Sequence, residues 1–179
     1  MIKHFTVFLA FVVTLSLPVA AQDLRRGLAA AQIGDYAAAI NEWRPLAEAG
    51  DEIAQYNLGF MSEAGRGVPQ DYKEAARWYG LAAEQGLVEA QYILAVFYET
   101  GSGVPRDEKE AIKWFRLAAE QGLPEAQNSI GLRYQFGQGV PQNYNEAKKW
   151  YQLAAEQGFA LAQYALGDIR QMTNNISQI

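Results

Sequence analysis

The sequence repeats itself with a period of 36 residues. The six residues LAAEQG occur three times and a looser copy, PLAEAG, once, and these copies end at four evenly spaced glycines: Gly50, Gly86, Gly122 and Gly158. The repetition divides most of the chain into three full units, residues 51–86, 87–122 and 123–158, followed by a shortened one. A fixed period of this length is typical of proteins in which small modules stack in a row, because one module cannot bury its apolar face alone.

Each unit is predicted to begin with a helix that ends at a glycine-rich turn. In the first unit, Ala54, Leu58 and Met61 follow helical spacing. The segment GRGVPQ follows, in which the glycines permit positive φ and the proline cannot continue a helix, so the first helix is expected to stop there. The glycines of this turn recur in every unit as Gly65, Gly67, Gly101, Gly103, Gly137 and Gly139. A phosphate-binding loop would need a strand before it and Lys-Ser/Thr after it, so these segments are interpreted as turns.

A second helix follows each turn. Asp71 with Glu74 forms a capping-box pattern, in which each side chain satisfies a backbone N–H of the first helical turn. Within this helix a tryptophan recurs among alanines, at Trp78, Trp114 and Trp150. An indole ring beside small residues is typical of tight helix packing, so these rings are predicted to lie in the core. The glycine that ends LAAEQG is predicted to stop the helix in the left-handed conformation.

These motifs resemble the Sel-1-like repeat family, which is related to tetratricopeptide repeats. The elements A-x-x-x-L-G, G-x-G-V, D-Y-x-x-A-x-x-W-Y and A-A-E-Q-G occur in family order between residue 51 and about residue 167. The resemblance implies an all-α fold, an α-solenoid of antiparallel helix pairs. The chain departs from the family pattern at Ala95, which replaces a glycine, at Glu108, which replaces a tyrosine, and at Ser62, which replaces an aromatic residue.

The segments that flank the three units are also predicted to be helical. Residues 22–50 resemble a tetratricopeptide-type helix pair with a shorter connection, and Pro45 is expected to kink its second helix. Residues 159–172 are predicted to form a first helix without a partner, which caps the last unit. The polar residues 173–179 are predicted to be a flexible tail.

Residues 1–21 have the order of a secretory signal peptide. A short basic start precedes a mainly apolar run and a small-residue end, which predicts cleavage after Ala21. The alternative, an uncleaved membrane anchor, is disfavoured because the run is shorter than the roughly 20 apolar residues that span a bilayer. We therefore expect a bacterial protein that is exported to the periplasm or secreted, with no stable membrane insertion after cleavage.

Composition excludes several kinds of site. The chain has no cysteine and one histidine, His4, which cleavage would remove. Disulfides, Ser-His-Asp and Cys-His nucleophiles and the usual zinc ligand sets are therefore excluded, and we expect no metal or cofactor. A net charge of −5 without a basic run argues against nucleic-acid binding. Catalysis by carboxylates alone remains open, but Glu84, Glu120 and Glu156 recur in every unit and are interpreted as solvated helix ends.

The candidate binding surface lies on the first helices. The resemblance implies that these helices line a concave face, and their exposed positions mix tyrosine, apolar residues and carboxylates, which favours a protein or peptide with apolar anchors and some basic character. The predicted positions are Ile53, Tyr56, Phe60, Glu63, Glu89, Tyr92, Val96, Glu99, Glu125, Asn128, Leu132, Gln135, Leu161, Tyr164 and Asp168. Whether the tyrosines belong to this groove or to the core between units stays open.

The function predicted from these observations is that of a non-catalytic scaffold or adaptor of the cell envelope, which binds a protein or peptide partner. One alternative is an enzyme acting on cell-wall or β-lactam molecules, since some cysteine-rich members of the resembled family are associated with β-lactams. This chain lacks those cysteines and has no S-x-x-K pattern. A second alternative is self-association through the unpaired C-terminal helix, and the oligomeric state stays open.

Overall fold

The structure, a computed structural model, describes residues 19–176, and all of the regular secondary structure in that range is helical. The helices are α1 (Val19–Gln32), α2 (Tyr36–Glu48), α3 (Glu52–Ala64), α4 (Tyr72–Glu84), α5 (Val88–Thr100), α6 (Glu108–Glu120), α7 (Pro124–Phe136), α8 (Tyr144–Glu156) and α9 (Ala160–Ile176). The predicted all-α class is confirmed. The predicted signal peptide lies almost entirely outside the described residues.

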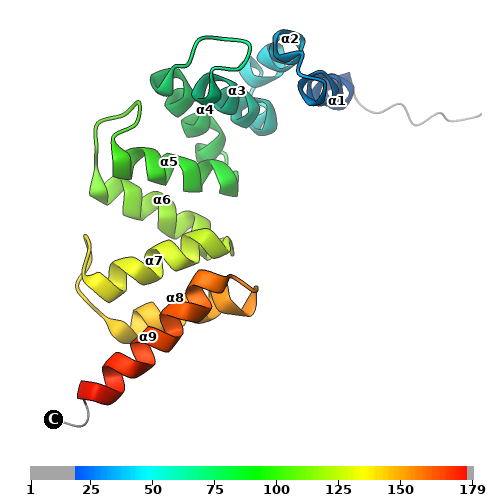
Figure 1. Cartoon of the computed structure of the whole chain (residues 1–179). Coiled ribbons are helices and arrows are strands. Elements are labelled where there is room, and N and C mark those ends of the chain that lie inside the picture. The colour runs from blue at the N-terminus through cyan, green and yellow to red at the C-terminus, as the bar shows by residue number, and fades with distance from the viewer. Residues whose placement is uncertain (1–18, 177–179) are drawn as a thin grey trace, which may run out of the picture.

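The helices stack in chain order. Each helix packs mainly on the helix before it and the helix after it, so that α1 and α9 lie at opposite ends of a single file (Figure 1). The helix pairs α3–α4, α5–α6 and α7–α8 are the three units of the sequence repeat. This is the antiparallel α-solenoid predicted from the 36-residue period.

The recurrent small and aromatic residues form the core of the stack. The alanine near the start of each first helix is fully buried, at Ala54, Ala90 and Ala126. Trp78 and Trp114 are buried as well, and Trp150 is half-buried against the core of the preceding unit. The tryptophans therefore lie in the interior, as their position among alanines predicts.

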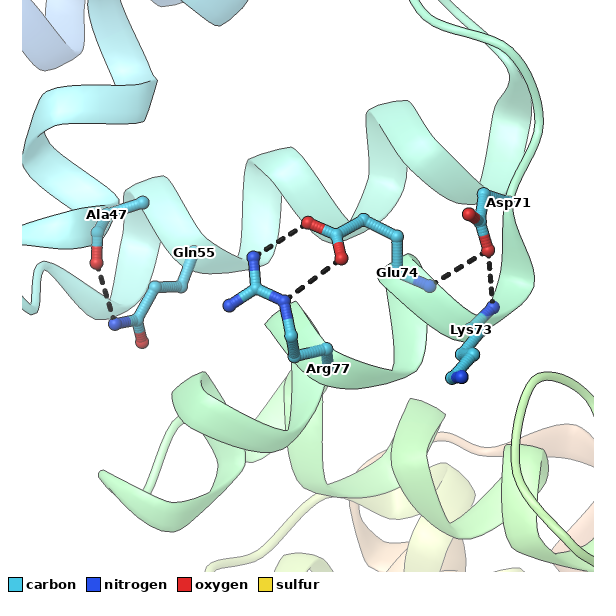
Figure 2. A network of polar contacts seen from close by, with 6 residues as sticks. All are labelled: Ala47, Gln55, Asp71, Lys73, Glu74 and Arg77. Atoms are coloured by element: carbon cyan, nitrogen blue, oxygen red, sulfur yellow. Dashed lines mark hydrogen bonds and ion pairs between the residues drawn. The ribbon is translucent and has the colours of Figure 1, made fainter.

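The second helices are capped by side chains, although only half of the capping box forms. Oδ1 of Asp71 accepts hydrogen bonds from the backbone N–H groups of Lys73 and Glu74, at 2.9 and 3.0 Å (Figure 2). The expected return bond from Glu74 is absent: its carboxylate pairs with Arg77 at 2.7 Å, while the N–H of Asp71 donates to the carbonyl of Ser62. The backbone of the preceding helix has already satisfied the N–H group that Glu74 would have met. The other two units repeat this arrangement.

The second glycine of each G-x-G turn is needed where neighbouring units meet. Gly103 has a φ of 69°, and a Cβ at this position would overlap the carbonyl oxygen of Tyr72, in the first turn of the preceding second helix. Gly67 and Gly139 lie 36 residues before and after Gly103, and a Cβ there would also meet the preceding helix, at Tyr36 and Ile112. The turn glycines therefore let the loop of one unit lie directly on the helix of the unit before it.

A network of glutamines joins the units, and the sequence analysis did not anticipate it. In each unit the glutamine after the buried alanine donates from Nε2 to a backbone carbonyl of the preceding second helix (Figure 2). These bonds are Gln55 to Ala47 at 3.0 Å, Gln91 to Ala83 at 3.2 Å and Gln127 to Ala119 at 3.2 Å. Their Oε1 atoms accept hydrogen bonds from the glutamines of LAAEQG: Gln85, Gln121 and Gln157. The repeated glutamines thus satisfy buried polar groups between helices.

The terminal segments differ from the prediction in one boundary. Helix α2 continues through Pro45 to Glu48. Helix α9 extends to Ile176, beyond the predicted end at Met172. No glycine or proline lies between Asp168 and Ile176 to stop it, so the polar composition of residues 173–176 does not interrupt the helix.

Candidate functional site

The predicted binding positions lie on the first helices of successive units, and we call them together the first-helix surface. They comprise the residues predicted on α3, α5, α7 and α9. Eight are exposed: Ile53, Phe60, Glu89, Glu99, Glu125, Leu132, Leu161 and Tyr164. Five are half-buried: Tyr56, Glu63, Tyr92, Val96 and Asp168. Exposed apolar and aromatic side chains beside carboxylates therefore do follow one face of the stack.

Two of the predicted positions are buried. Only 8% of Asn128 and 5% of Gln135 is accessible, so the expectation that they lie on the exposed stripe is wrong. Gln135 accepts a hydrogen bond from the hydroxyl of Tyr151 at 2.6 Å, which draws its side chain into the α7–α8 pair. Helical spacing places both residues on the correct side of α7, but it does not show how deeply the neighbouring helices cover them.

A hollow of about 290 Å³ lies where α3, α5 and α7 meet. Tyr56 and Tyr92 line it together with the carboxylates of Glu89 and Glu125. The phenol of Tyr56 is half-buried, and burial raises its pKa, with further contributions from the charges of Glu89 and Glu63. The Tyr56 side chain is therefore neutral at physiological pH, and the hollow combines aromatic surface with negative charge.

The three tyrosines of the first-helix surface differ in whether they contact the core. The ring centroid of Tyr56 lies 5.5 Å from that of Tyr79, and the ring of Tyr92 lies 5.5 Å from that of Phe115. Tyr56 and Tyr92 thus contribute one side of the ring to the core and the other to the hollow. Tyr164 is 72% exposed. It lines a second hollow, of about 240 Å³, between α7 and α9.

Two of the glutamates on the surface have partners within the protein. Glu63 accepts a hydrogen bond from Tyr79, and Glu99 pairs with Arg133 at 2.7 Å. Among the described residues, Glu89, Glu125 and Asp168 take part in no ion pair. These three carboxylates of the surface can therefore meet a cation from a partner without breaking an existing contact of the kind that holds Glu63 or Glu99.

A larger hollow lies elsewhere, between the second helices α4 and α6. It has a volume of about 740 Å³ and is lined by Gly80, Tyr98 and Trp114, among others. An equivalent hollow between α2 and α4, lined by Arg44, Ser62 and Trp78, measures about 280 Å³. This hollow was not predicted from the sequence, although alignment of the units shows glycine at position 80 where arginine occupies positions 44 and 116.

The described residues contain no group of three or more side chains suited to hold a metal ion. None of the helices in the range 19–176 is both long and apolar enough to cross a membrane. The recurrent glutamates Glu84, Glu120 and Glu156 are all exposed near the ends of second helices, where water solvates them.

Comparison with known proteins identifies the family. The Sel1 repeat model matches residues 53–87, 88–123 and 124–159, which together make up more than half of the chain. The chain therefore belongs to the Sel1 repeat family. No curated protein matches it.

Two solved structures resemble it closely. A protective antigen present in uropathogenic Escherichia coli strains, which displays an SLR fold, is 42% identical with a TM-score of 0.80, over 84% of this chain and 33% of that chain. A Sel1 repeat protein from Oxalobacter formigenes is 36% identical with a TM-score of 0.79, over 85% of this chain and 62% of that chain. The chain thus spans a third of the first relative and somewhat less than two thirds of the second.

Proposed function

We propose that the chain is a non-catalytic scaffold that binds a protein or peptide segment through the first-helix surface. The observation that carries this proposal is the mixed surface itself, in which exposed Phe60, Leu132 and Tyr164 alternate with carboxylates along successive helices. Apolar and aromatic anchors surrounded by polar groups are the side chains that contribute most to protein interfaces. A segment with apolar side chains and a basic residue fits it best.

The same surface does not support an enzyme. Its carboxylates stand at solvent-exposed positions, as Glu89 and Glu125 do, or are held by another side chain, as Glu63 is by Tyr79 and Glu99 is by Arg133. We expect the purified chain to show no turnover of β-lactams. Turnover that a single side-chain substitution abolishes would favour the alternative enzyme.

Export to the cell envelope is part of the proposal. It rests on the pattern of residues 1–21 and agrees with the description of one relative as a protective antigen. Mass measurement of the chain recovered from the periplasm or medium of an expressing bacterium tests it. The expected protein begins at Gln22, whereas a chain that retains Met1 in the cytoplasm would contradict export.

Binding is tested by crosslinking and capture with three forms of the chain. The wild type is compared with the double variant Phe60→Ala, Tyr164→Ser, which changes two exposed side chains of the surface. Leu153→Ala is the control, because Leu153 is an apolar residue on a second helix and its exposure of 44% is close to the 39% of Phe60. We expect the double variant alone to lose the captured partner. Capture that survives the double variant places the binding surface elsewhere.

A further inference from the structure

Gly80 lies in the middle of α4, and packing does not explain it. A Cβ built at this position meets nothing within 4 Å. By contrast, a Cβ at Gly59 or Gly131 would meet the ring of Tyr79 or Tyr151 at 2.8 and 2.6 Å, so those two glycines permit close helix packing. Glycine weakens the interior of a helix, so a glycine beside open space has a cost without a structural gain.

The neighbouring units show what occupies this position when it is not glycine. Arg116, 36 residues further on, donates from Nη2 to the hydroxyl of Tyr134 in α7 at 3.3 Å. The same offset in the sequence pairs Gly80 with Tyr98, and both line the large hollow. In the hollow between α2 and α4, the equivalent Arg44 is present and the volume falls from about 740 to about 280 Å³. The hollow beside Gly80 therefore lies where the neighbouring units have an arginine side chain.

The charges around the hollow favour a cation. Its lining includes four carboxylates and three basic side chains: Asp71, Glu74, Glu84 and Glu110, with Lys73, Arg77 and Lys113. Glu74 pairs with Arg77 at 2.7 Å, and Glu110 pairs with Lys113 at 3.0 Å. Once these pairs are formed, two carboxylates and one lysine remain. The net charge of these unpaired side chains is negative, as is the net charge of the whole chain.

Trp114 forms part of the wall of the hollow. It is 9% exposed, and its indole nitrogen is buried without a hydrogen-bond partner among the described residues. The ring therefore offers the hollow apolar surface, which suits the aliphatic part of an arginine side chain.

We propose that the hollow between α4 and α6 binds an arginine side chain of a peptide or protein segment. The guanidinium lies beside Gly80 and donates to the hydroxyl of Tyr98, as Arg116 does to Tyr134 within the protein. Arginine is favoured over lysine because its planar guanidinium presents several donors in a fixed geometry. This site is on the second helices and goes beyond the function proposed for the first-helix surface.

The test is an NMR titration of the full chain with the blocked peptide Ac-Ala-Leu-Arg-Leu-Ala-NH2. We expect saturable shifts of the Trp114 indole N–H and of the Gly80 amide, with a Kd on the order of 1 mM or below. Peptides with citrulline or lysine in place of arginine are the ligand controls. Citrulline keeps the shape and removes the charge, and we expect its peptide to bind at least ~10-fold more weakly.

Three variants make the test specific. Gly80→Arg restores the residue of the neighbouring units and should abolish binding without loss of thermal stability. Gly80→Ala adds only a methyl group in open space and should leave binding unchanged. Phe60→Ala, on the first-helix surface, should also leave it unchanged, so that failure here and failure of the proposed scaffold function are distinguishable. The proposal is overturned if no shift saturates, if the citrulline or lysine peptide binds as tightly, or if Gly80→Arg retains binding.

Discussion

The hydroxyl of Tyr79 in α4 donates a hydrogen bond to Oε2 of Glu63 in α3, 2.7 Å away. Burial raises the pKa of Tyr79 far above its ordinary value, and the bond to Glu63 and its charge raise it further. Tyr151 and Gln135 repeat this link two units on, and burial, with the charge of Asp168, also raises the pKa of Tyr151. Within the helix pairs α3–α4 and α7–α8, the two helices are therefore joined by a tyrosine hydroxyl that must remain protonated.

These tyrosines predict loss of stability at alkaline pH. In the unfolded chain a tyrosine loses its proton near its ordinary pKa of 10.0, whereas in the folded chain Tyr79 keeps it. The stabilising contribution of each protonated tyrosine is therefore fully present below pH 10. As the pH rises toward the folded pKa, the free energy of unfolding falls by up to about 1.4 kcal/mol per pH unit for each tyrosine. Urea unfolding of the wild type and Tyr79→Phe at about pH 8 and 11 measures this. The variant should show the shallower fall, and equal slopes would contradict the assignment.

Arg133 is predicted to be the most important charged side chain for stability. It is 7% exposed in its side chain, pairs with Glu99, donates to the carbonyl of Ser129 at 2.9 Å and lies 4.2 Å from the ring centre of Phe115. Arg133→Ala leaves these groups without their partner and should cost about 3 kcal/mol. Lys149→Ala is the control, because Lys149 pairs with Glu146 on an exposed helix surface, and it should cost less than about 0.5 kcal/mol. Similar losses in denaturant unfolding would show that burial of Arg133 is unimportant.

The two glycines of one turn are predicted to respond differently to the same substitution. Gly101 and Gly103 both have positive φ, at 78° and 69°. A Cβ added at Gly101 would lie 3.5 Å from the Cβ of Arg106, whereas a Cβ added at Gly103 would overlap the backbone of Tyr72. Gly101→Ala should therefore cost about 1 kcal/mol of conformational strain, and Gly103→Ala about 3 kcal/mol or more. Thermal unfolding of both variants checks this, and equal shifts would mean that the loop does not rest on the preceding unit.

The glutamine network is predicted to stabilise contacts between units. Gln91→Ala removes the donor to the buried carbonyl of Ala83 and the acceptor for Gln121. The loss should be about 1–3 kcal/mol, since buried polar groups are left unpaired. Gln152→Ala, an exposed glutamine of α8, should change the unfolding free energy by less than about 0.5 kcal/mol. If denaturant unfolding gives the same value for both, the network contributes nothing measurable.

The fold could be predicted from the sequence because repetition makes each signal appear several times. The helix caps at Asp71 and Asp107 and the left-handed glycines are local features, and local features are set by residue type. The return bond of the capping box was not predictable in the same way. It depends on the carbonyl of Ser62, which lies nine residues earlier in the chain and reaches Asp71 only after the turn has formed.

The candidate site was predicted less completely, for physical reasons. From the sequence alone, a glutamine after a buried alanine is expected to be a polar surface residue. The role of Gln91 could not be predicted, because it depends on the Ala83 carbonyl of the preceding helix. The burial of Asn128 and Gln135 depends on neighbouring helices, which spacing along α7 does not describe. The exception is Gly80: its difference from Arg44 and Arg116 is visible in the aligned units, and it marks the hollow between α4 and α6.

The most direct test of the scaffold function is site-specific photocrosslinking in intact cells. A photoreactive phenylalanine analogue replaces exposed Leu132 on the first-helix surface or exposed Leu153 on α8, and the crosslinked peptides are mapped by mass spectrometry. The proposed function predicts that position 132 joins one recurring polypeptide segment with apolar and basic side chains, while position 153 does not. Equal crosslinking at both positions, or crosslinking at position 153 alone, would contradict it.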